Sequence, residues 1–269
     1  MKLVVKLSGK VLEEADLRRE IVRQIGELRS AGHSLLIVHG AGKQLTELSK
    51  QLGIPVVQHQ GRRVTDEKTL EVAKMVFSAV NRDLTALLVS RGVPALGLTA
   101  FDAGLTKSRR RPPLPIQTSE GKTEEIDFGL VADIREVNRA EILGLVESYL
   151  PVICSLCADD SGQILNINAD TVATELAIAW GADRLISVSD VDGIYLHPED
   201  PSSLIPRLSV TSARELLERG CFTAGMAPKV QTALKALEHG VAAFQVVSGI
   251  KPGGLLNAIN LDTGTLLVA

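Results

Sequence analysis

The sequence predicts an α/β protein, a three-layer α/β/α sandwich around an open and mainly parallel central sheet. Short apolar segments with the length of strands alternate with amphipathic segments of helical period along the whole chain. Strands that alternate with helices in this way favour a parallel sheet with helices on both faces. The 269 residues are 45% hydrophobic, which is enough to build a sizeable core.

A βαβ unit opens the chain. Residues 2–7 are predicted as a buried strand, residues 13–31 as an amphipathic helix that ends at Gly32, and residues 34–38 as a second strand. Further helices are predicted at 43–52, 66–80, 81–92, 139–147, 169–180, 212–220 and 227–240, and strands at 95–98, 151–154, 184–188, 243–247 and 265–268.

Two segments interrupt the alternation. Residues 56–63 and 157–166 are typical of hairpins, which often form lids over an α/β core. The basic, proline-rich residues 107–115 are predicted to be the least ordered part of the chain. Since no linker composition or internal repeat is present, we expect a single domain over residues 1–269, with any crossover between two lobes near residues 165–185.

Composition excludes several classes of protein. The net charge of −3 argues against a nucleic-acid partner, and no apolar run reaches the roughly 20 residues of a membrane span. Without a secretory h-region and with three cysteines, the chain is expected in the cytoplasm. Cys154 and Cys157 form a C-x-x-C pair, but no second pair completes a zinc set, so small buried residues at a strand end are favoured.

Glycine-rich turns follow the first two predicted strands. Lys6-Leu7-Ser8-Gly9 ends the first strand and His39-Gly40-Ala41-Gly42 ends the second. Both lie at the carboxyl edge, where open α/β sheets bind ligands. Glycine allows close approach to a phosphate, and a helix that begins near Lys43 directs free amides at an anion. A tight strand-to-helix turn that binds no ligand would have the same pattern. A Walker P-loop is excluded, because it would need glycine at Ile37 and a hydroxyl at Gln44.

Four further segments carry polar groups that suit a ligand, and each also has a structural explanation. Asn166-Ile167-Asn168-Ala169-Asp170 is consistent with two amides that face one ligand, or with an N-cap. Residues 189–195 follow a strand and would suit a nucleotide or form an acidic turn. In 225–229, Pro228 fixes the direction of Lys229, which is otherwise a solvated lysine. In 61–66, Arg63 is suited to a carboxylate ligand or a surface ion pair.

Taken together, the order and spacing of these motifs resemble the amino acid kinase family, and within it the acetylglutamate kinases. The resemblance runs from residue 2 to the last strand. It rests on Lys6-x-x-Gly9, His39-Gly-x-Gly42, Gly61-x-Arg63-x-Thr65-Asp66, Asn166-x-Asn168-Ala-Asp170, Asp190-Val-Asp-Gly193-Ile-Tyr195 and Gly225-Met-x-Pro-Lys229.

The resemblance implies transfer of the γ-phosphoryl group of MgATP to the side-chain carboxylate of N-acetyl-L-glutamate, a step of arginine biosynthesis. It implies that Lys6, Lys229 and Asp170 are catalytic, with Asp170 paired to both lysines. The implied phosphate site is Gly9, Gly40, Ala41 and Gly42, and the implied substrate site is Arg63, Asn166 and Asn168. The implied nucleotide site is Ser189, Asp190, Val191, Gly193, Tyr195, Gly225 and Met226. ATP and Mg²⁺ are the expected cofactors, without a protein metal site, because Mg²⁺ would bridge phosphate oxygens. An amino-terminal lobe of about residues 1–175 would hold the acceptor and a dimer interface, and residues 176–269 would hold ATP.

Two departures from the family pattern keep alternatives open. Ser8 and Ala41 stand where glycines are usual, and Ala41 requires a negative φ to avoid backbone strain. A kinase for aminoadipate or glutamate linked to a carrier protein is one alternative, because Arg109, Arg110 and Arg111 could contact such an acceptor. A catalytically silent amino-acid sensor is another. We expect a homodimer, with the apolar face of residues 66–80 as a candidate interface, that arginine does not inhibit.

Overall fold

A single open sheet forms the centre of the protein. A computed structural model describes residues 1–269 except 60, 118–122, 198, 223–225, 261–262 and 269. The eight strands lie in the order β14 (Arg207–Ser209), β16 (Thr265–Val268), β15 (Ala243–Ser248), β13 (Arg184–Ser189), β1 (Lys2–Leu7), β2 (Ser34–His39), β10 (Leu150–Cys154) and β5 (Ala95–Thr99). All neighbours pair in parallel except β15 and β16, which are antiparallel.

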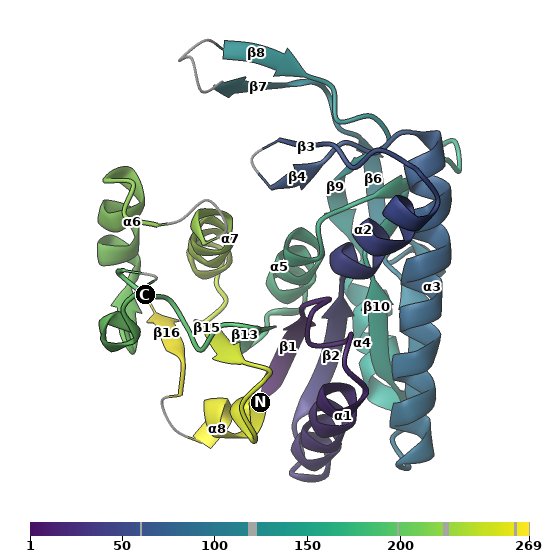
Figure 1. Cartoon of the computed structure of the whole chain (residues 1–269). Helices are drawn as coiled ribbons and strands as arrows, with labels where there is room; N and C mark the ends of the chain where they lie inside the picture. The colour runs from purple at the N-terminus through teal and green to yellow at the C-terminus, as the bar shows by residue number, and fades with distance from the viewer. Residues whose placement is uncertain (60, 118–122, 198, 223–225, 261–262, 269) are drawn as a thin grey trace.

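Helices cover both faces of this sheet (Figure 1). One face packs on α1 (Ala15–Ser30), α2 (Gly42–Gln51), α3 (Glu67–Ser90) and α8 (Gly254–Asn260). The other packs on α4 (Arg139–Ser148), α5 (Ala169–Trp180), α6 (Val210–Glu218) and α7 (Ala227–Glu238). Single 3₁₀ turns occupy Asp102–Gly104 and Pro201–Ser203. The predicted three-layer α/β/α sandwich is confirmed.

Strand β1 shows how the sheet directs its side chains. Leu3, Val5 and Leu7 belong to the apolar cluster on the α1 face, whereas Val4 belongs to the cluster on the α5 face. Successive side chains of a strand point to opposite faces, so Lys6 shares the α5 face with Val4. The residue is only 7% exposed. A lysine is therefore held inside the central strand, directed at α5.

The two predicted hairpins are confirmed. The first pairs β3 (Gln58–His59) with β4 (Arg62–Arg63), and the second pairs β11 (Leu156–Ala158) with β12 (Ile164–Asn166). The first hairpin lies above the carboxyl edge of the sheet in Figure 1, over α5. It can therefore cover a ligand bound at that edge.

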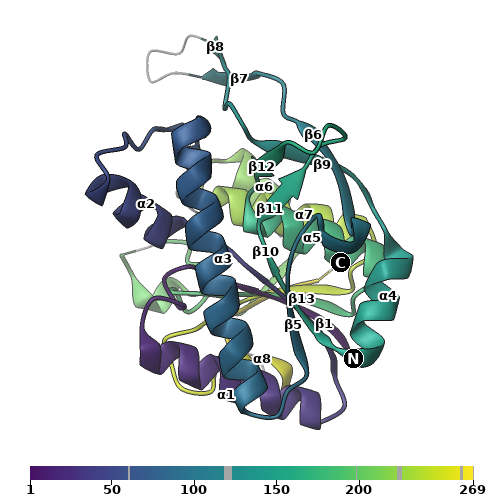
Figure 2. The ribbon, with the colours of Figure 1, turned by 90° about the vertical axis from the view of Figure 1, so that its right-hand side faces the viewer.

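The prediction that residues 107–115 are the least ordered part of the chain is wrong. Strand β6 (Thr106–Arg110) pairs with β9 (Ala132–Val137), and β7 (Leu114–Gln117) pairs with β8 (Thr123–Ile126) in a hairpin that projects from the body in Figures 1 and 2. The basic side chains are neutralised locally: Arg110 contacts Asp127 at 2.9 Å and Arg111 contacts Asp133 at 2.7 Å. Ion pairs with acidic residues that are distant in sequence thus allow this charged segment to form strands.

Helix α3 corrects a second prediction. The segments 66–80 and 81–92 were expected as two helices, but Glu67–Ser90 is one continuous helix, which crosses the molecule in Figure 2. Asn81, at the expected break, is 2% exposed, and its amide donates to the Val152 carbonyl at 2.9 Å. Its polar group is satisfied across the sheet, so it does not interrupt the helix. Helix α8 and strand β14 were not predicted.

The suggested crossover near residues 165–185 contains helix α5, which packs on β1 and β13. The division into two lobes stays a prediction. Among the described residues, no helix combines the length and apolar character needed to span a membrane.

Candidate functional site

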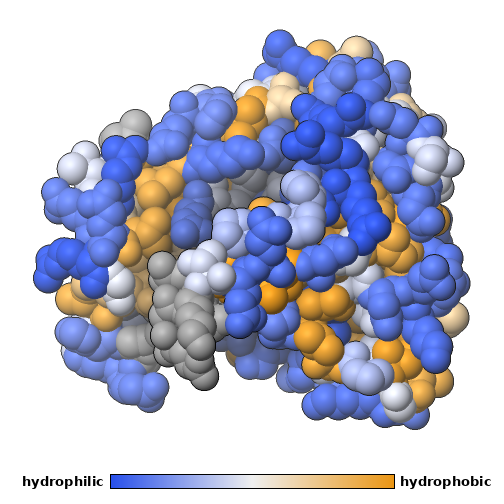
Figure 3. All heavy atoms as spheres, turned by 90° about the horizontal axis from the view of Figure 1, so that it is seen from above, coloured by the Kyte–Doolittle hydropathy of each residue, from blue (hydrophilic) through white to orange (hydrophobic). Residues whose placement is uncertain are grey.

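The carboxyl ends of the central strands bring the predicted motifs together. Lys6 pairs in register with Val38 on one side and with Ser187 on the other, so the loops after β1, β2 and β13 are neighbours. A cavity of about 530 Å³ opens there. Its lining includes nine of the predicted site residues: Lys6, Gly9, Gly40, Ala41, Gly42, Arg63, Asn166, Asn168 and Asp170. Hydrophilic residues cover most of this face of the molecule (Figure 3).

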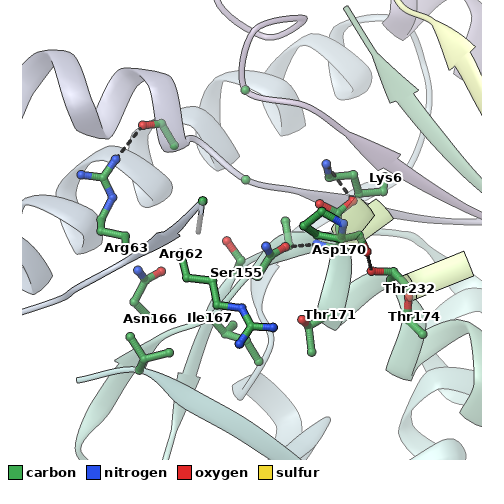
Figure 4. Close-up of a pocket in the computed structure, with 18 of the residues that line it drawn as sticks. Lys6, Arg62, Arg63, Ser155, Asn166, Ile167, Asp170, Thr171, Thr174 and Thr232 are labelled. Atoms are coloured by element: carbon green, nitrogen blue, oxygen red, sulfur yellow. Dashed lines mark hydrogen bonds and ion pairs between the residues drawn. The ribbon is translucent and has the colours of Figure 1, made fainter. Parts of the chain in front are cut away.

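Lys6 and Asp170 form an ion pair at one end of the cavity. The Lys6 Nζ atom lies 2.9 Å from Asp170 Oδ1, and the two side chains are 9% and 23% exposed (Figure 4). Asp170 is in the first turn of α5, where the helix dipole favours a carboxylate. The ion pair holds the Lys6 amine at the cavity wall.

Lys229 has a different partner. Its Nζ atom donates to Ser189 Oγ at 2.8 Å, and Ser189 in turn donates to Asp190 at 3.1 Å. Asp170 was expected to pair with both lysines, but its ion pair within 4 Å is with Lys6. Burial lowers the pKa of Lys229, the nearby Lys6 charge lowers it further, and Asp170 and Asp190 oppose the shift. The two lysines therefore share one electrostatic environment.

The loops after β1 and β2 pack against each other. Gln44 donates to the Gly9 carbonyl at 2.8 Å, and a Cβ on Gly9 would lie 2.9 Å from Gln44 Oε1. The first-turn amides of α2, from Gly42 onward, lack helical acceptors and are available to an anion. Ala41 has φ −148° and is fully buried, so the predicted need for a negative φ is confirmed.

A buried histidine supports this loop. His39 Nε2 lies 3.0 Å from Asn81 Nδ2, and its Nδ1 lies 3.3 Å from the Gly40 carbonyl. Complete burial lowers the pKa of His39 to about 4, so the ring is neutral near pH 7. A neutral ring accepts from Asn81 and donates toward Gly40, which links α3 to the loop after β2.

Arg63 lies at the α2 end of the cavity. Its Nη2 donates to Thr46 Oγ1 at 2.6 Å and to the Gly42 carbonyl at 3.2 Å. Figure 4 shows the Arg63 side chain directed to this end of the cavity. Burial lowers its pKa. Its Nη1 atom is buried without a hydrogen-bond partner among the described residues. A buried guanidinium with an unused donor is suited to a carboxylate ligand.

The two asparagines before α5 have different hydrogen-bond partners. Asn166 donates to Thr65 Oγ1 at 3.1 Å and lies close to Arg63 and Ile167 in the wall shown in Figure 4. Asn168 is the N-cap of α5 and accepts from the Asp170 amide at 2.7 Å. Its cap role fixes the start of the helix and hence the position of Asp170.

The residues assigned to the nucleotide surround the end of β13. None of Ser189, Asp190, Val191, Gly193, Tyr195 and Met226 is among the described residues that line the cavity. A Cβ on Gly193 would lie 2.6 Å from Thr265 Oγ1, so packing against β16 requires this glycine. The Tyr195 hydroxyl contacts Asp192 at 3.2 Å, and Met226 is the N-cap residue of α7. Gly225 lies outside the described residues.

Several cationic residues near the site were not among the predicted site residues. Arg62 and Arg111 line the cavity, and Lys10 contacts Asp190 at 2.8 Å. Because neighbours on an extended strand point to opposite sides, strand alternation would place only one of two adjacent arginines in the site, whereas the structure brings both Arg62 and Arg63 to the cavity wall. Arg111 depends on the pairing of β6 with β9, which the sequence analysis did not predict.

The residues present fit an anionic phosphate donor. Ser8 Oγ and Arg63 Nη1 are buried and have no partner among the described residues, and Gly42 has open space where a Cβ would stand. No three His, Cys, Asp or Glu side chains gather as a metal site within the described part of the chain. Asp170 and Asp190 are each paired with a lysine. A divalent ion would therefore enter the site bound to the phosphates of the nucleotide.

Known proteins resemble the chain over almost its full length. Residues 1–248 match the model of the amino acid kinase family. The acetylglutamate kinase of Sorangium cellulosum is 41% identical, covering 99% of this chain and 94% of its own. That of Myxococcus xanthus is 40% identical, covering 98% and 88%. The chloroplastic enzyme of Arabidopsis thaliana is 37% identical, covering 97% and 73%.

Solved structures share the fold. An N-acetylglutamate synthase from Neisseria gonorrhoeae, complexed with coenzyme A and N-acetyl-glutamate, superposes with a TM-score of 0.84 at 25% identity. The match covers all of this chain but only 59% of the synthase. Carbamate kinase from Giardia superposes with a TM-score of 0.69 at 16% identity, covering 99% and 98%. The latter similarity supports the fold alone.

Proposed function

The chain belongs to the amino acid kinase family, and we propose that it transfers the γ-phosphoryl group of ATP to the side-chain carboxylate of N-acetyl-L-glutamate. The observation that carries the proposal is the combination, in one cavity, of the Lys6–Asp170 pair, the free amides at the start of α2 and the Arg63 guanidinium. Relatives that are 37–41% identical over most of their length are acetylglutamate kinases. The product would enter arginine biosynthesis.

The chemistry needs alignment and charge compensation more than acid–base catalysis. A carboxylate acceptor is already ionised near pH 7 and needs no general base. Lys6 would neutralise charge on the transferring phosphoryl oxygens, and the amides of Gly9, Ala41 and Gly42 would hold these oxygens. Lys229 would add a second positive charge from α7. Asp170 keeps Lys6 oriented.

The acceptor would lie between the transfer end and Arg63. The unused Nη1 donor of Arg63 suits the α-carboxylate, with Asn166 beside it. ATP would reach the cavity from the end of β13, where Ser189, Asp190, Val191, Gly193 and Tyr195 lie, with Met226 at the start of α7. Gly225 completes this proposed nucleotide site in the sequence motif. Mg²⁺, bound to the phosphates, would supply further charge neutralisation.

The carrier-linked alternative depends on the polyarginine run, and two contacts weaken it. Arg110 and Arg111 form ion pairs with Asp127 and Asp133. Much of the local charge is therefore already compensated and less available to an acidic carrier. Free N-acetyl-L-glutamate remains the better-supported acceptor.

A hydroxylamine trap tests the reaction directly. The purified chain is incubated with MgATP, hydroxylamine and, in turn, N-acetyl-L-glutamate, L-glutamate, L-aspartate and N-acetyl-L-aminoadipate. Hydroxamate from N-acetyl-L-glutamate is the expected result. No hydroxamate above a protein-free control, despite binding of ATP, would favour the silent sensor.

We also propose a cytoplasmic homodimer. Met75 and Val89 on the outer side of α3 are 58% and 53% exposed, which suits an interface. The remaining apolar face of α3 is buried against the core. Three free cysteines are compatible with a reducing compartment. Light scattering should give twice the chain mass, and Met75→Lys should shift it toward the monomer.

A further inference from the structure

Arg62 is a cation in the wall of the cavity that has no partner within the described part of the chain. It follows Gly61 on β4 and pairs in register with His59, while Arg63 pairs with Gln58. The two arginines leave the strand in different directions: Arg63 points to α2, whereas Arg62 points toward the start of α5, where Thr171 lies (Figure 4). Among the described residues, no hydrogen bond or ion pair holds the Arg62 guanidinium. Its donors are therefore available to a ligand.

The other cations of the wall have partners. Lys6 contacts Asp170 at 2.9 Å, Arg111 contacts Asp133 at 2.7 Å, and Lys235 contacts Glu175. Arg63 donates to uncharged oxygens, so these hydrogen bonds do not compensate its positive charge. The cavity thus has two guanidiniums without a carboxylate within ion-pair distance among the described residues, Arg62 and Arg63. Partial desolvation and the charge of Arg111 lower the pKa of Arg62, and the charge of Asp133 opposes this shift.

This charge distribution treats two related acceptors differently. L-Glutamate and N-acetyl-L-glutamate share both carboxylates, which Arg63 and the transfer site can accommodate. Free glutamate also carries an α-ammonium, which Arg62 would repel. Acylation removes that charge and adds a carbonyl oxygen that can accept from a guanidinium.

We propose that Arg62 is a specificity-determining residue that selects acceptors with an acylated α-nitrogen, by repelling a free α-ammonium and donating to the acyl carbonyl. The inference rests on the proposed function, since it assumes that a small amino-acid derivative occupies this cavity. It assigns to Arg62 a role distinct from that of Arg63, which would hold the α-carboxylate in either acceptor.

The test compares the wild-type chain with Arg62→Leu and Arg62→Lys. The kcat and KM values for N-acetyl-L-glutamate and L-glutamate are measured in the hydroxylamine assay. Arg109→Leu is the matched control, because Arg109 is an exposed arginine on β6 that does not line this cavity. The preference for the acylated acceptor is the kcat/KM for N-acetyl-L-glutamate divided by that for L-glutamate. Arg62→Leu should lower this preference about ten-fold, because repulsion between two partly exposed positive charges has an effect of that order.

The change should appear mainly in KM, with kcat for N-acetyl-L-glutamate within about three-fold of wild type. Arg62→Lys retains the repulsion and should keep most of the preference, and Arg109→Leu should match wild type. An unchanged ratio in Arg62→Leu would overturn the inference. So would an equal loss of kcat for both acceptors at constant KM, which would place Arg62 at the phosphoryl group.

Calorimetric titration separates this inference from the proposed function. If wild type produces no hydroxamate, the proposed reaction fails, but the binding of the two acceptors can still be compared. Tighter binding of N-acetyl-L-glutamate by wild type, with a smaller preference in Arg62→Leu, would support the role of Arg62. Equal preference in both proteins, or binding of neither acceptor, would overturn it.

Discussion

Lys6 and Lys229 come from two regions that hold a charged amine in different ways. Lys6 belongs to the central strand, is 7% exposed and contacts a carboxylate, Asp170, at 2.9 Å. Lys229 belongs to the first turn of α7, after Pro228, and contacts a hydroxyl, Ser189, at 2.8 Å. Of the two lysines, Lys6 alone forms an ion pair with a carboxylate of the residues that the structure describes, so the protonation of Lys229 is more sensitive to its surroundings. Burial and the Lys6 charge accordingly lower its pKa.

Replacing Lys6 should have the largest effect. Lys6→Ala removes the anchored charge from the transfer end of the cavity, and kcat should fall about 100-fold or more, with the acceptor KM within about three-fold. The matched control is Lys2→Ala, at the opposite end of the same strand. Steady-state kinetics in the hydroxylamine assay measures both. A modest loss of kcat would show that Lys6 is not at the phosphoryl group.

Removing the hydroxyl partner of Lys229 should have a smaller effect. Ser189→Ala leaves the Lys229 amine without its hydrogen-bond acceptor, and a bond to a charged group is worth about ten-fold in kcat. Ser187→Ala is the control, because that hydroxyl lies on the same strand and has no partner among the described residues. Equal kinetics for Ser189→Ala and wild type would mean that this contact does not position Lys229.

The pH dependence of kcat should distinguish the two lysines further. In the proposed reaction Lys229 acts in its charged form. Because its pKa is lowered, kcat should fall on the alkaline side before the pH at which an ordinary lysine titrates, about 10.5. Lys229→Arg should shift this limb upward, because a guanidinium stays protonated. A limb at the same pH in both proteins would assign the titration to another group.

The smallest effect concerns the helix that carries Asp170. Asn168→Ala removes the N-cap of α5 and should lower the free energy of unfolding by about 1 kcal/mol, as measured in urea. Asn168→Ser keeps a capping oxygen and should restore most of it. If Asn168 also binds substrate, Asn168→Ser should raise the acceptor KM while stability stays near wild type.

Local signals explain what could be predicted around the site. Glycines after β1 and β2, the cap at Asn168 and the proline before Lys229 depend on short-range geometry, so the sequence indicated each of them. The continuous α3 could not be anticipated in this way, because Asn81 is satisfied by His39 and by the Val152 carbonyl, which are distant in sequence. The pairing of β6 with β9 has the same origin, since Asp133 neutralises Arg111.

The sequence alone determined the α/β class, the hairpins and the residue types that gather at the carboxyl edge, because period, turn chemistry and strand alternation are local properties. The tertiary structure decided the partners: Asp170 contacts Lys6, Ser189 contacts Lys229, and Arg62 has no partner among the described residues. Electrostatic pairing depends on distances of a few ångströms between segments far apart in the chain. Only the packing of α5, α7 and β4 around the sheet sets those distances.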